Sequence, residues 1–273
     1  MSAVLPTHAR FQIGAFEVMP LLSGARTVEN PHGIFGLNVG EAEFEAVSRK
    51  NLLPIHASQF FFTPTLINTG TEYVLFDTGV TPEGMIAALA AAGLTPQDID
   101  TIVITHMHGD HINGLMNGGD EVFTNACYVT GQVEYDFWAK AENEGFEEKV
   151  RPLAEKFSFI KGGQSVAPGI DAIDAFGHTP GHMNFMLDSD GAQMCLIVDS
   201  ANHYVWSLAY PDWEVKFDMD KTRAAANRRR IFDMLAADRV PFTGYHMPFP
   251  AVGYVETRGD GYRYVPHSYQ LYL

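Results

Sequence analysis

The sequence is poor in cysteine, and no long apolar run occurs in it. Its two cysteines, Cys127 and Cys195, both lie in strand-like apolar segments. We therefore expect two buried free thiols and no disulfide framework. No stretch approaches the roughly 18 apolar residues that a membrane span requires, and residues 1–10 hold no apolar signal core. We expect no membrane partner and a cytoplasmic protein, with an already removed leader left open.

Basic residues are also scarce. The 18 lysines and arginines face 33 acidic residues, which gives a net charge of −15. Such a charge repels phosphate backbones, so we expect no nucleic-acid partner; it also serves to keep a protein in solution. The only basic cluster, Arg228–Arg230, lies in an alanine-rich helical stretch and is predicted to be a solvated face. The 273 residues, 46% hydrophobic and without repeats, predict a single domain over residues 1–273.

The most informative segment that is present is a histidine cluster after the apolar run 101–104. It places His106, His108, Asp110 and His111 within six residues. In extended chain, side chains at i and i+2 point the same way, so His106 and His108 can bind one ion together. Asp110 and His111 follow the turn and can face a second ion. So many ligand types at one strand end indicate a metal site rather than a plain polar loop.

Further ligand types occur downstream, each where an apolar segment gives way to a turn. They are His178 and His182 in a Gly-His-Thr-Pro-Gly-His segment, then Asp199, then His246. With the first cluster they supply enough imidazoles and carboxylates for two adjacent ions. Asp199 is the natural bridge, because a carboxylate has two oxygens to share.

In this order the motifs resemble the metallo-β-lactamase superfamily, over roughly residues 66–246. The segment Phe76–Gly79 resembles the end of that superfamily's first strand. The resemblance implies an α/β fold, a four-layered αββα sandwich. It places one ion on His106, His108 and His178, and a second on Asp110, His111 and His246, with Asp199 bridging. His182 would then lie behind the ligands or pack under its turn.

A finer resemblance is to methyl parathion hydrolases and related lactonases. It rests on Asp136–Trp138, on the spacing of the later ligands and on the ending His246–Pro266. It implies a hydrolase of lactones and aryl esters that also accepts organophosphate triesters. A dedicated N-acyl-homoserine lactonase is the alternative. Those lactonases carry a tyrosine three residues after the bridging aspartate, where this chain has Asn202, with Tyr204 nearby.

The ligand set also predicts a mechanism. We expect two divalent ions per chain, zinc by default, although iron, manganese and cobalt suit the same ligands. A hydroxide bridging two such ions would be the nucleophile. Asp110 could relay a proton to the leaving group. Asp77 would either orient a metal-bound imidazole or cap its turn.

Substrate determinants are less visible in the sequence. We expect an apolar pocket for a small lactone or ester, and predict that it is formed by Phe61, Phe62, Trp138, Asn202, Tyr204 and Phe249. Core packing is the usual alternative role for aromatic residues. An exposed apolar region at Phe60–Phe62 would suit a homodimer.

Two other functional classes remain open. The first is an iron-dependent oxidoreductase on the same fold, although the chain has no flavin domain and keeps all of the ligands. The second is a non-catalytic, metal-stabilised binding module. Such structural sites are usually closed and rich in cysteine, and this one has no cysteine ligand.

The apolar rhythm predicts the main elements. Residues 11–22 and 63–76 are predicted strands, the second interrupted by a hairpin turn at 68–71. Thr81 and Pro82 begin a predicted helix that reaches residue 92. Further helices are expected over residues 132–143, 146–157 and 220–237. Residues 26–58 are predicted to be irregular, forming a lid, a dimer arm or a surface excursion.

Overall fold

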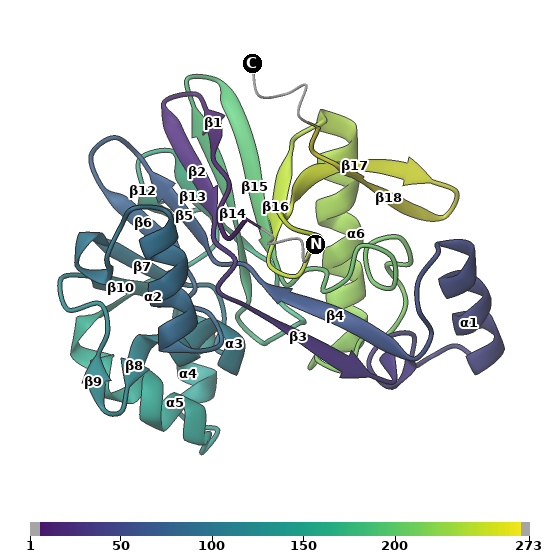
Figure 1. The fold of residues 1–273 in the computed structure, drawn as a ribbon, viewed down its shortest axis with the longest axis horizontal. Coiled ribbons are helices and arrows are strands. Elements are labelled where there is room, and N and C mark those ends of the chain that lie inside the picture. The colour runs from purple at the N-terminus through teal and green to yellow at the C-terminus, as the bar shows by residue number, and fades with distance from the viewer. Residues whose placement is uncertain (1–5, 269–273) are drawn as a thin grey trace, which may run out of the picture.

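The computed structural model describes residues 6–268, and its layers follow the predicted αββα order (Figure 1). Two seven-stranded mixed sheets pack face to face, with helices outside both. The first sheet contains, in spatial order, β1 (Phe11–Ile13), β2 (Phe16–Pro20), β5 (Thr65–Asn68), β6 (Tyr73–Phe76), β7 (Thr101–Ile104), β10 (Cys127–Gly131) and β11 (Phe157–Ile160). The second contains β12 (Ser165–Ala167), β13 (Ile170–Asp174), β14 (Met183–Ser189), β15 (Ala192–Val198), β16 (Phe242–Gly244), β17 (Val252–Arg258) and β18 (Gly261–Pro266).

The helices divide between the two outer layers. Those beside the first sheet are α2 (Pro82–Ala91), α3 (Gly109–Ile112), α4 (Gln132–Trp138) and α5 (Glu144–Lys149). The long helix α6 (Lys221–Asp238) covers the second sheet. Short 3-10 turns are η1 (Pro31–Gly33), η2 (Pro96–Asp98), η3 (Asn113–Leu115) and η4 (Arg151–Lys156). Among the described residues, every helix is too short or too polar to cross a membrane.

The central strands are apolar on both faces because each face meets a different core. In β6, Val74 and Phe76 point to the core between the sheets, whereas Leu75 points to the core under α2. In β15, Leu196 belongs to the inter-sheet core and Ile197 to the core under α6. This is why the central strands appear in the sequence as continuous apolar runs rather than alternating ones.

Local signals set several element boundaries. Thr81 caps α2, because its hydroxyl accepts the Gly84 N–H at 3.1 Å. The turn at residues 68–71 joins β5 to β6 as predicted. The predicted strand 11–22 is instead the hairpin β1–β2, which turns at Gly14 with φ of 57°. The predicted helices 132–143 and 146–157 are shorter, and Pro152, which has no N–H, follows the end of α5.

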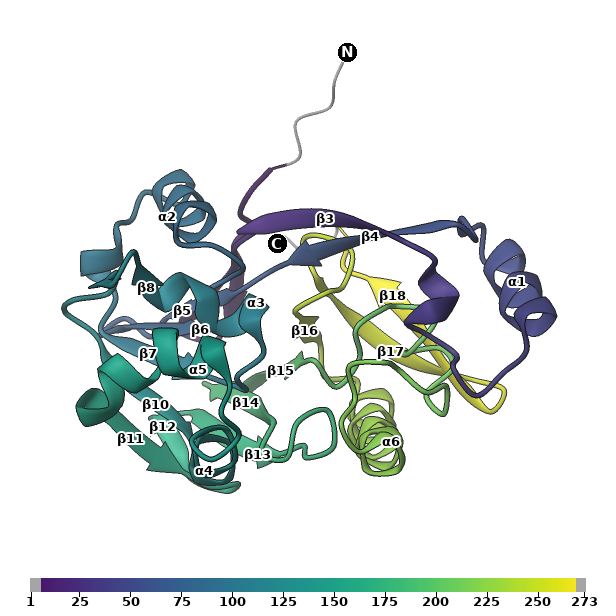
Figure 2. The same cartoon turned by 90° about the horizontal axis from the view of Figure 1, so that it is seen from below.

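The region predicted to be irregular is ordered. It contains β3 (Gly24–Glu29) and α1 (Glu41–Lys50), and it leads into β4 (Ala57–Phe62). Strands β3 and β4 form a two-stranded antiparallel ribbon. Figure 2 shows this ribbon running from the side of the first sheet toward α1, which lies on the side of the second sheet. A second small hairpin joins β8 (Met116–Asn117) and β9 (Asp120–Glu121).

Three expectations about exposure are wrong. Cys195 is a buried free thiol, but Cys127, the first residue of β10, is exposed. Arg228 is only 1% exposed, so the basic cluster is not a uniform solvated face. Phe60 and Phe62 are buried, so they do not form the exposed apolar region that would suit a homodimer. The homodimer itself stays a prediction.

The inter-sheet core should carry much of the stability. Phe185 is fully buried there and packs on Phe76 with ring centroids 4.8 Å apart. Replacing it with alanine should lower the free energy of unfolding by about 3–5 kcal/mol, because a large cavity is left. Urea unfolding measures this. Phe159→Ala, at a site 38% exposed, is the control and should cost under about 1 kcal/mol. Equal losses in both variants would contradict the assignment of the core.

Candidate metal centre

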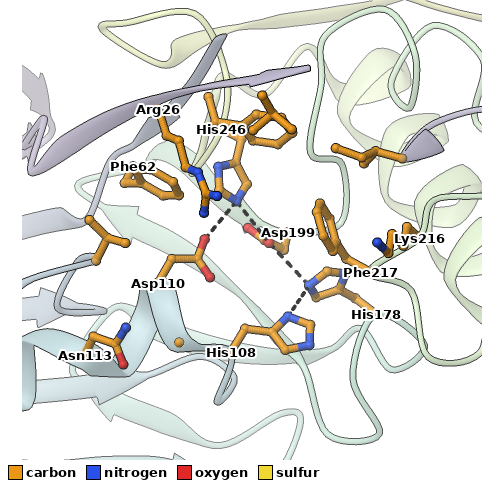
Figure 3. A pocket seen from close by; sticks show the side chains of 15 residues that line it. Arg26, Phe62, His108, Asp110, Asn113, His178, Asp199, Lys216, Phe217 and His246 are labelled. Carbon is orange, nitrogen blue, oxygen red and sulfur yellow. Dashed lines mark hydrogen bonds and ion pairs between the residues drawn. The ribbon is translucent and has the colours of Figure 1, made fainter. Parts of the chain in front are cut away.

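Loops from both sheets converge on one place at the base of a cavity (Figure 3). The loop after β7 supplies His106, His108, Asp110 and His111, as predicted from the sequence. The β13–β14 connection supplies His178, the end of β15 supplies Asp199, and the end of β16 supplies His246. Strands that run toward the same edge thus bring together side chains that are far apart in the chain.

One group of donor atoms comes from His106, His108 and His178, all within 4.8 Å of one another. The closest pair is His108 Nδ1 and His178 Nε2, at 3.0 Å. Two ring nitrogens at this separation can share either a proton or a metal ion. The group consists of the three residues that the family resemblance assigns to the first ion, apart from Asp199.

The second group consists of Asp110, His111 and His246. Asp110 Oδ2 lies 3.4 Å from His246 Nε2 and 3.7 Å from His111 Nε2. The Asp110 side chain also lines the cavity. It can therefore hold an ion and face a substrate.

Asp199 lies between the two groups. Its Oδ1 is 3.6 Å from His111 Nε2, and its Oδ2 is 3.3 Å from both His178 Nε2 and His246 Nε2. The preceding residue, Val198, has a φ of 46°, which is unusual and strained for a β-branched side chain. This backbone, at a register shift between β15 and β16, turns Asp199 toward the cavity. A bridging carboxylate would need this central position.

The donor set fits two transition-metal ions. Among the described residues, His106 Nε2, His111 Nε2 and Asp199 Oδ1 are buried without a hydrogen-bond partner. Buried polar atoms are costly to leave unpaired, and a metal ion would satisfy all three. Ligands about 2.1 Å from a tetrahedral ion are separated by about 3.4 Å, which is close to the N–O separations above.

The remaining ring nitrogens are held by the scaffold. His111 Nδ1 lies 2.8 Å from Asp77 Oδ2, and His178 Nδ1 lies 2.9 Å from Asp218 Oδ1. His246 Nδ1 lies 2.9 Å from the carbonyl of Phe61. Each contact fixes the tautomer, so that Nε2 keeps its lone pair for a ligand. Asp77 thus orients an imidazole, and it also accepts the Thr105 N–H at 2.9 Å.

His182 differs from the candidate ligands because both of its ring nitrogens bond to backbone groups. Nε2 accepts the Asp199 N–H at 3.2 Å, and Nδ1 donates to the Ala175 carbonyl at 3.1 Å. It therefore supports the backbone of Asp199 from behind. Within the Gly-His-Thr-Pro-Gly-His turn, His178 is the residue whose Nε2 lies among the other candidate ligand atoms.

Glu134, which the sequence analysis missed, ties the two histidine loops together. Its carboxylate is buried and accepts the Met107 N–H at 2.9 Å, the Thr179 hydroxyl at 2.7 Å and the Gly181 N–H at 2.8 Å. Trp138 donates to the same carboxylate through Nε1. Burial raises the pKa of Glu134, and the four donors oppose that rise. No local motif marks this residue.

Asp218 was also missed in the sequence, and its position and its pKa depend on Arg228. The guanidinium donates to Asp218 Oδ2 at 2.7 Å, and to the carbonyls of Ser200 and Pro211. Burial alone would raise the pKa of Asp218, but Arg228 and His178 hold it below its usual value. Arg228 shares the buried stripe of α6 with Ala224, Ile231 and Leu235. That helical spacing was the available signal that it is not a surface residue.

The pKa of each histidine depends on the groups that surround it. Burial lowers the pKa of His178, but the hydrogen bonds to Asp199 and Asp218 outweigh this and raise it to about 9. Burial lowers the pKa of His111 too, yet Asp77, Asp110 and Asp199 together raise it well above its ordinary value. For His182, burial dominates and lowers the pKa to about 3.

A cavity of about 560 Å³ opens above these ligands. Its wall includes Val28, Ile34, Phe60, Phe62, Val80 and Phe217, so much of it is apolar. It also includes two cations, Arg26 and Lys216, which the predicted apolar pocket did not contain.

Most of the predicted pocket residues lie elsewhere. Phe62 lines the cavity, but Phe61 faces the other way and contributes only its carbonyl. Trp138 packs beneath His108, with ring centroids 6.0 Å apart. Asn202 is buried and donates to Asp199 Oδ2 at 2.8 Å. Tyr204 stacks on His203, and the half-buried Phe249 is not part of the cavity wall.

Comparisons with known proteins identify similar sequences and similar folds. The sequence profile of the Metallo-beta-lactamase superfamily matches residues 63–230. An N-acyl homoserine lactonase from Bacillus cereus is 26% identical over 119 residues, 44% of this chain and 45% of that protein. The match thus spans less than half the length of such curated relatives.

Two solved structures share the fold along nearly the whole chain. One is AidC, a dizinc quorum-quenching lactonase, with a TM-score of 0.87 and 24% identity over 96% of this chain and 98% of that one. The other is the hydrolase AbOPH of the beta lactamase superfamily, with a TM-score of 0.88 and 22% identity over 98% and 99% of the two chains.

Metal binding should release protons. In the metal-free protein, the pKa of His178 is raised to about 9, so at pH 7.5 this imidazole should be protonated, and the pKa of His111 is also raised above its ordinary value. An ion needs the neutral imidazole, so zinc uptake should release at least about one proton per chain. Apparent affinity should then rise with pH and level off above the pKa of His178. Calorimetric titration in two buffers of different ionisation enthalpy measures the release. Binding without proton release would contradict this charge state.

The carboxylate behind His178 should control metal affinity. Asp218→Asn should weaken zinc binding about 10- to 100-fold, because an amide orients and polarises the imidazole less well. Competition with a chelating dye measures the affinity, and urea unfolding checks that the variant is folded. Asp212→Asn is the matched control, since Asp212 is an exposed partner of Arg229 nearby. Unchanged zinc affinity in Asp218→Asn would show that the contact has no positioning role.

Proposed function

This chain belongs to the Metallo-beta-lactamase superfamily, and we propose that it is a dinuclear metal-dependent hydrolase of lactones and aryl esters. Weaker activity on organophosphate triesters is part of the proposal. The observation that carries it is the convergence of imidazole and carboxylate atoms, several without a partner, at the base of an open cavity. A closed structural site would have no such access.

Two ions would be held by the residues already described, with zinc the first choice for such nitrogen and oxygen ligands. The first would be held by His106, His108 and His178, the second by Asp110, His111 and His246, and both by Asp199. When bound, two such ions lower the pKa of water and polarise a carbonyl or phosphoryl oxygen. The protein's own part is to hold these side chains rigid and to admit the substrate from one side.

Asp110 is the residue best placed to move a proton. Its carboxylate belongs to the ligand group and also lines the cavity. In the proposed reaction it accepts a proton from the attacking water and returns it to the departing alkoxide or phenoxide. Hydrolysis is thereby balanced, because the water's hydroxyl joins the acyl group and its proton joins the leaving oxygen.

The leaving group receives little other assistance from acidic side chains. Asn202 is turned away from the cavity toward Asp199. Tyr245 is buried, and its hydroxyl donates to the Asp110 carbonyl. Because no tyrosine among residues 6–268 lines the cavity, the rate should depend on how acidic the leaving alcohol already is. This favours aryl esters and phenolic lactones over alkyl lactones.

A dedicated N-acyl-homoserine lactonase is the second candidate. The names of the Bacillus cereus relative and of AidC support it. The apolar wall formed by Phe60, Phe62 and Phe217 could accept an acyl chain. The two candidates differ in the expected order of substrates.

Steady-state kinetics on zinc-loaded protein tests the proposal. We expect kcat/KM to be higher for dihydrocoumarin than for N-hexanoyl-homoserine lactone, because a weakly discriminating pocket leaves leaving-group acidity to set the order of the two lactones. Paraoxon should be the slowest despite its acidic leaving group, because its tetrahedral phosphorus is more crowded than a planar carbonyl carbon. A homoserine lactone preferred by orders of magnitude would favour the second candidate. Turnover of none of the three by protein with two bound ions would overturn the proposal.

The same assays should depend on the bridging carboxylate. Asp199→Ala should abolish turnover of every substrate and reduce the zinc content, because both ion sites share that side chain. Asp188→Ala, an exposed carboxylate in β14, is the control and should keep both. Full zinc content with full turnover in Asp199→Ala would rule out the bridging role.

A further inference from the structure

We propose that the preferred substrate carries an anionic group, in the simplest case a carboxylate, which binds to Arg26 and Lys216 while the ester or lactone bond lies at the metal centre. This inference rests on the proposed function and narrows its substrate class. Neither cation is a metal ligand, and neither is needed for the hydrolysis itself. Their place in the cavity wall calls for a separate explanation.

Arg26 lies on the inner face of the β3–β4 ribbon. Its cross-strand partner is Phe60, and residues two positions apart share a face, so Val28 and Phe62 lie on the same side. All four line the cavity. The outer face carries Ala25 and Thr27 instead. Arg26 itself is exposed in the open cavity, so its guanidinium is accessible to a ligand that enters from solvent.

Figure 3 shows the Arg26 guanidinium pointing into the cavity, from the side of Phe62 and His246. Within residues 6–268, no carboxylate lies within 4.0 Å of it and it makes no hydrogen bond through its side chain. Most other arginines of this acidic protein have such a partner, as Arg228 and Arg229 do. The planar guanidinium of Arg26 is therefore free to bind a carboxylate through two parallel hydrogen bonds.

Lys216 faces the cavity from the segment that precedes α6, beside Phe217 (Figure 3). Its backbone is fixed, because its N–H donates to the Ile34 carbonyl at 2.7 Å and Val215 pairs with Phe35. Its ammonium group also has no carboxylate partner in the described part of the chain. Two unpaired cations from separate elements thus share one cavity.

The charges of the cavity favour an anion when the metal centre is filled. The carboxylates in the cavity wall are Asp110 and Asp199, which carry two negative charges between them. Two divalent ions bring four positive charges, so these carboxylates would then be fully engaged. Arg26 and Lys216 would face a region without free negative charge. A substrate with an anionic group supplies the missing charge.

The positions of these groups also suggest how such a substrate is built. Phe60, Phe62 and Phe217 lie in the wall together with the cations. An apolar spacer would pack on these rings, with the scissile bond at one end and the anionic group at the other. An acyl chain that ends in a carboxylate has this shape. A phosphate monoester offers the same anionic oxygens.

Two matched 4-nitrophenyl esters test the inference on zinc-loaded protein. The hexanoate is neutral, and the hemi-adipate replaces its terminal methyl group with a carboxylate. We expect the hemi-adipate to have the higher kcat/KM. Arg26→Gln should lower that value about tenfold or more, as expected for loss of a charged hydrogen bond, with the hexanoate changed less than about twofold. Lys216→Gln should act in the same direction.

Lys161→Gln is the control, since it removes one exposed positive charge far from the cavity, in the loop after β11. It should leave the preference unchanged. All assays are run at one ionic strength near 0.15 M, where the Debye length is about 8 Å, so that distant charges contribute little. Urea unfolding confirms that each variant is folded.

The outcomes separate the two proposals. Equal kcat/KM for both esters, or equal losses of both in Arg26→Gln, would overturn the anionic-substrate inference and leave the hydrolase. If neither ester is turned over, the hydrolase proposal fails, and calorimetric binding of adipate against hexanoate decides the inference. Tighter adipate binding that Arg26→Gln abolishes would support it, and equal binding of both acids would overturn it.

Discussion

The candidate centre depends on one constraint: an imidazole has two nitrogens, and it can face a metal ion with one only if the other is fixed. Asp77, Asp218 and the carbonyl of Phe61 supply that second contact for His111, His178 and His246. These three partners come from β6, from the segment before α6 and from the β3–β4 ribbon. The centre can therefore form only when both sheets and the ribbon are in place.

This arrangement places several energetically unfavourable features, buried charges and a strained backbone, in a small volume. Asp199 and Asp218 are buried carboxylates, Arg228 is a buried guanidinium, and Val198 has a left-handed backbone. Each of these would destabilise an isolated loop. Three apolar cores, one between the sheets and one under each helical layer, offset the cost. The strained backbone of Val198 directs Asp199 to a position between the two groups of ligands. The geometry of the site is therefore obtained at the expense of stability.

The candidate ligand residues could be found in the sequence because they form short-range patterns, whereas the sandwich and the division of the ligands between two ions were implied by the family resemblance. His106 and His108 are two residues apart at a strand end, and the remaining ligands each follow an apolar run. The supporting residues could not be found in this way, since Asp218 lies 40 residues from His178 and Asp77 lies 34 from His111. Only Arg228 left a signal, because it lies on the apolar stripe of α6 and such a position favours burial, although a solvated face was predicted for it.

The cavity wall was predicted poorly for a related reason. Being close in sequence to a ligand says nothing about the direction of a side chain, and in β4 that direction alternates at every residue. Phe60 and Phe62 face the cavity, while Phe61 between them does not. Net charge says equally little about the cavity. A value of −15 describes the whole chain, whereas the cavity wall carries two cations, Arg26 and Lys216, beside the carboxylates Asp110 and Asp199. These nearby charges set the field that a bound ligand meets, because charges on the distant surface are screened over a Debye length of about 8 Å.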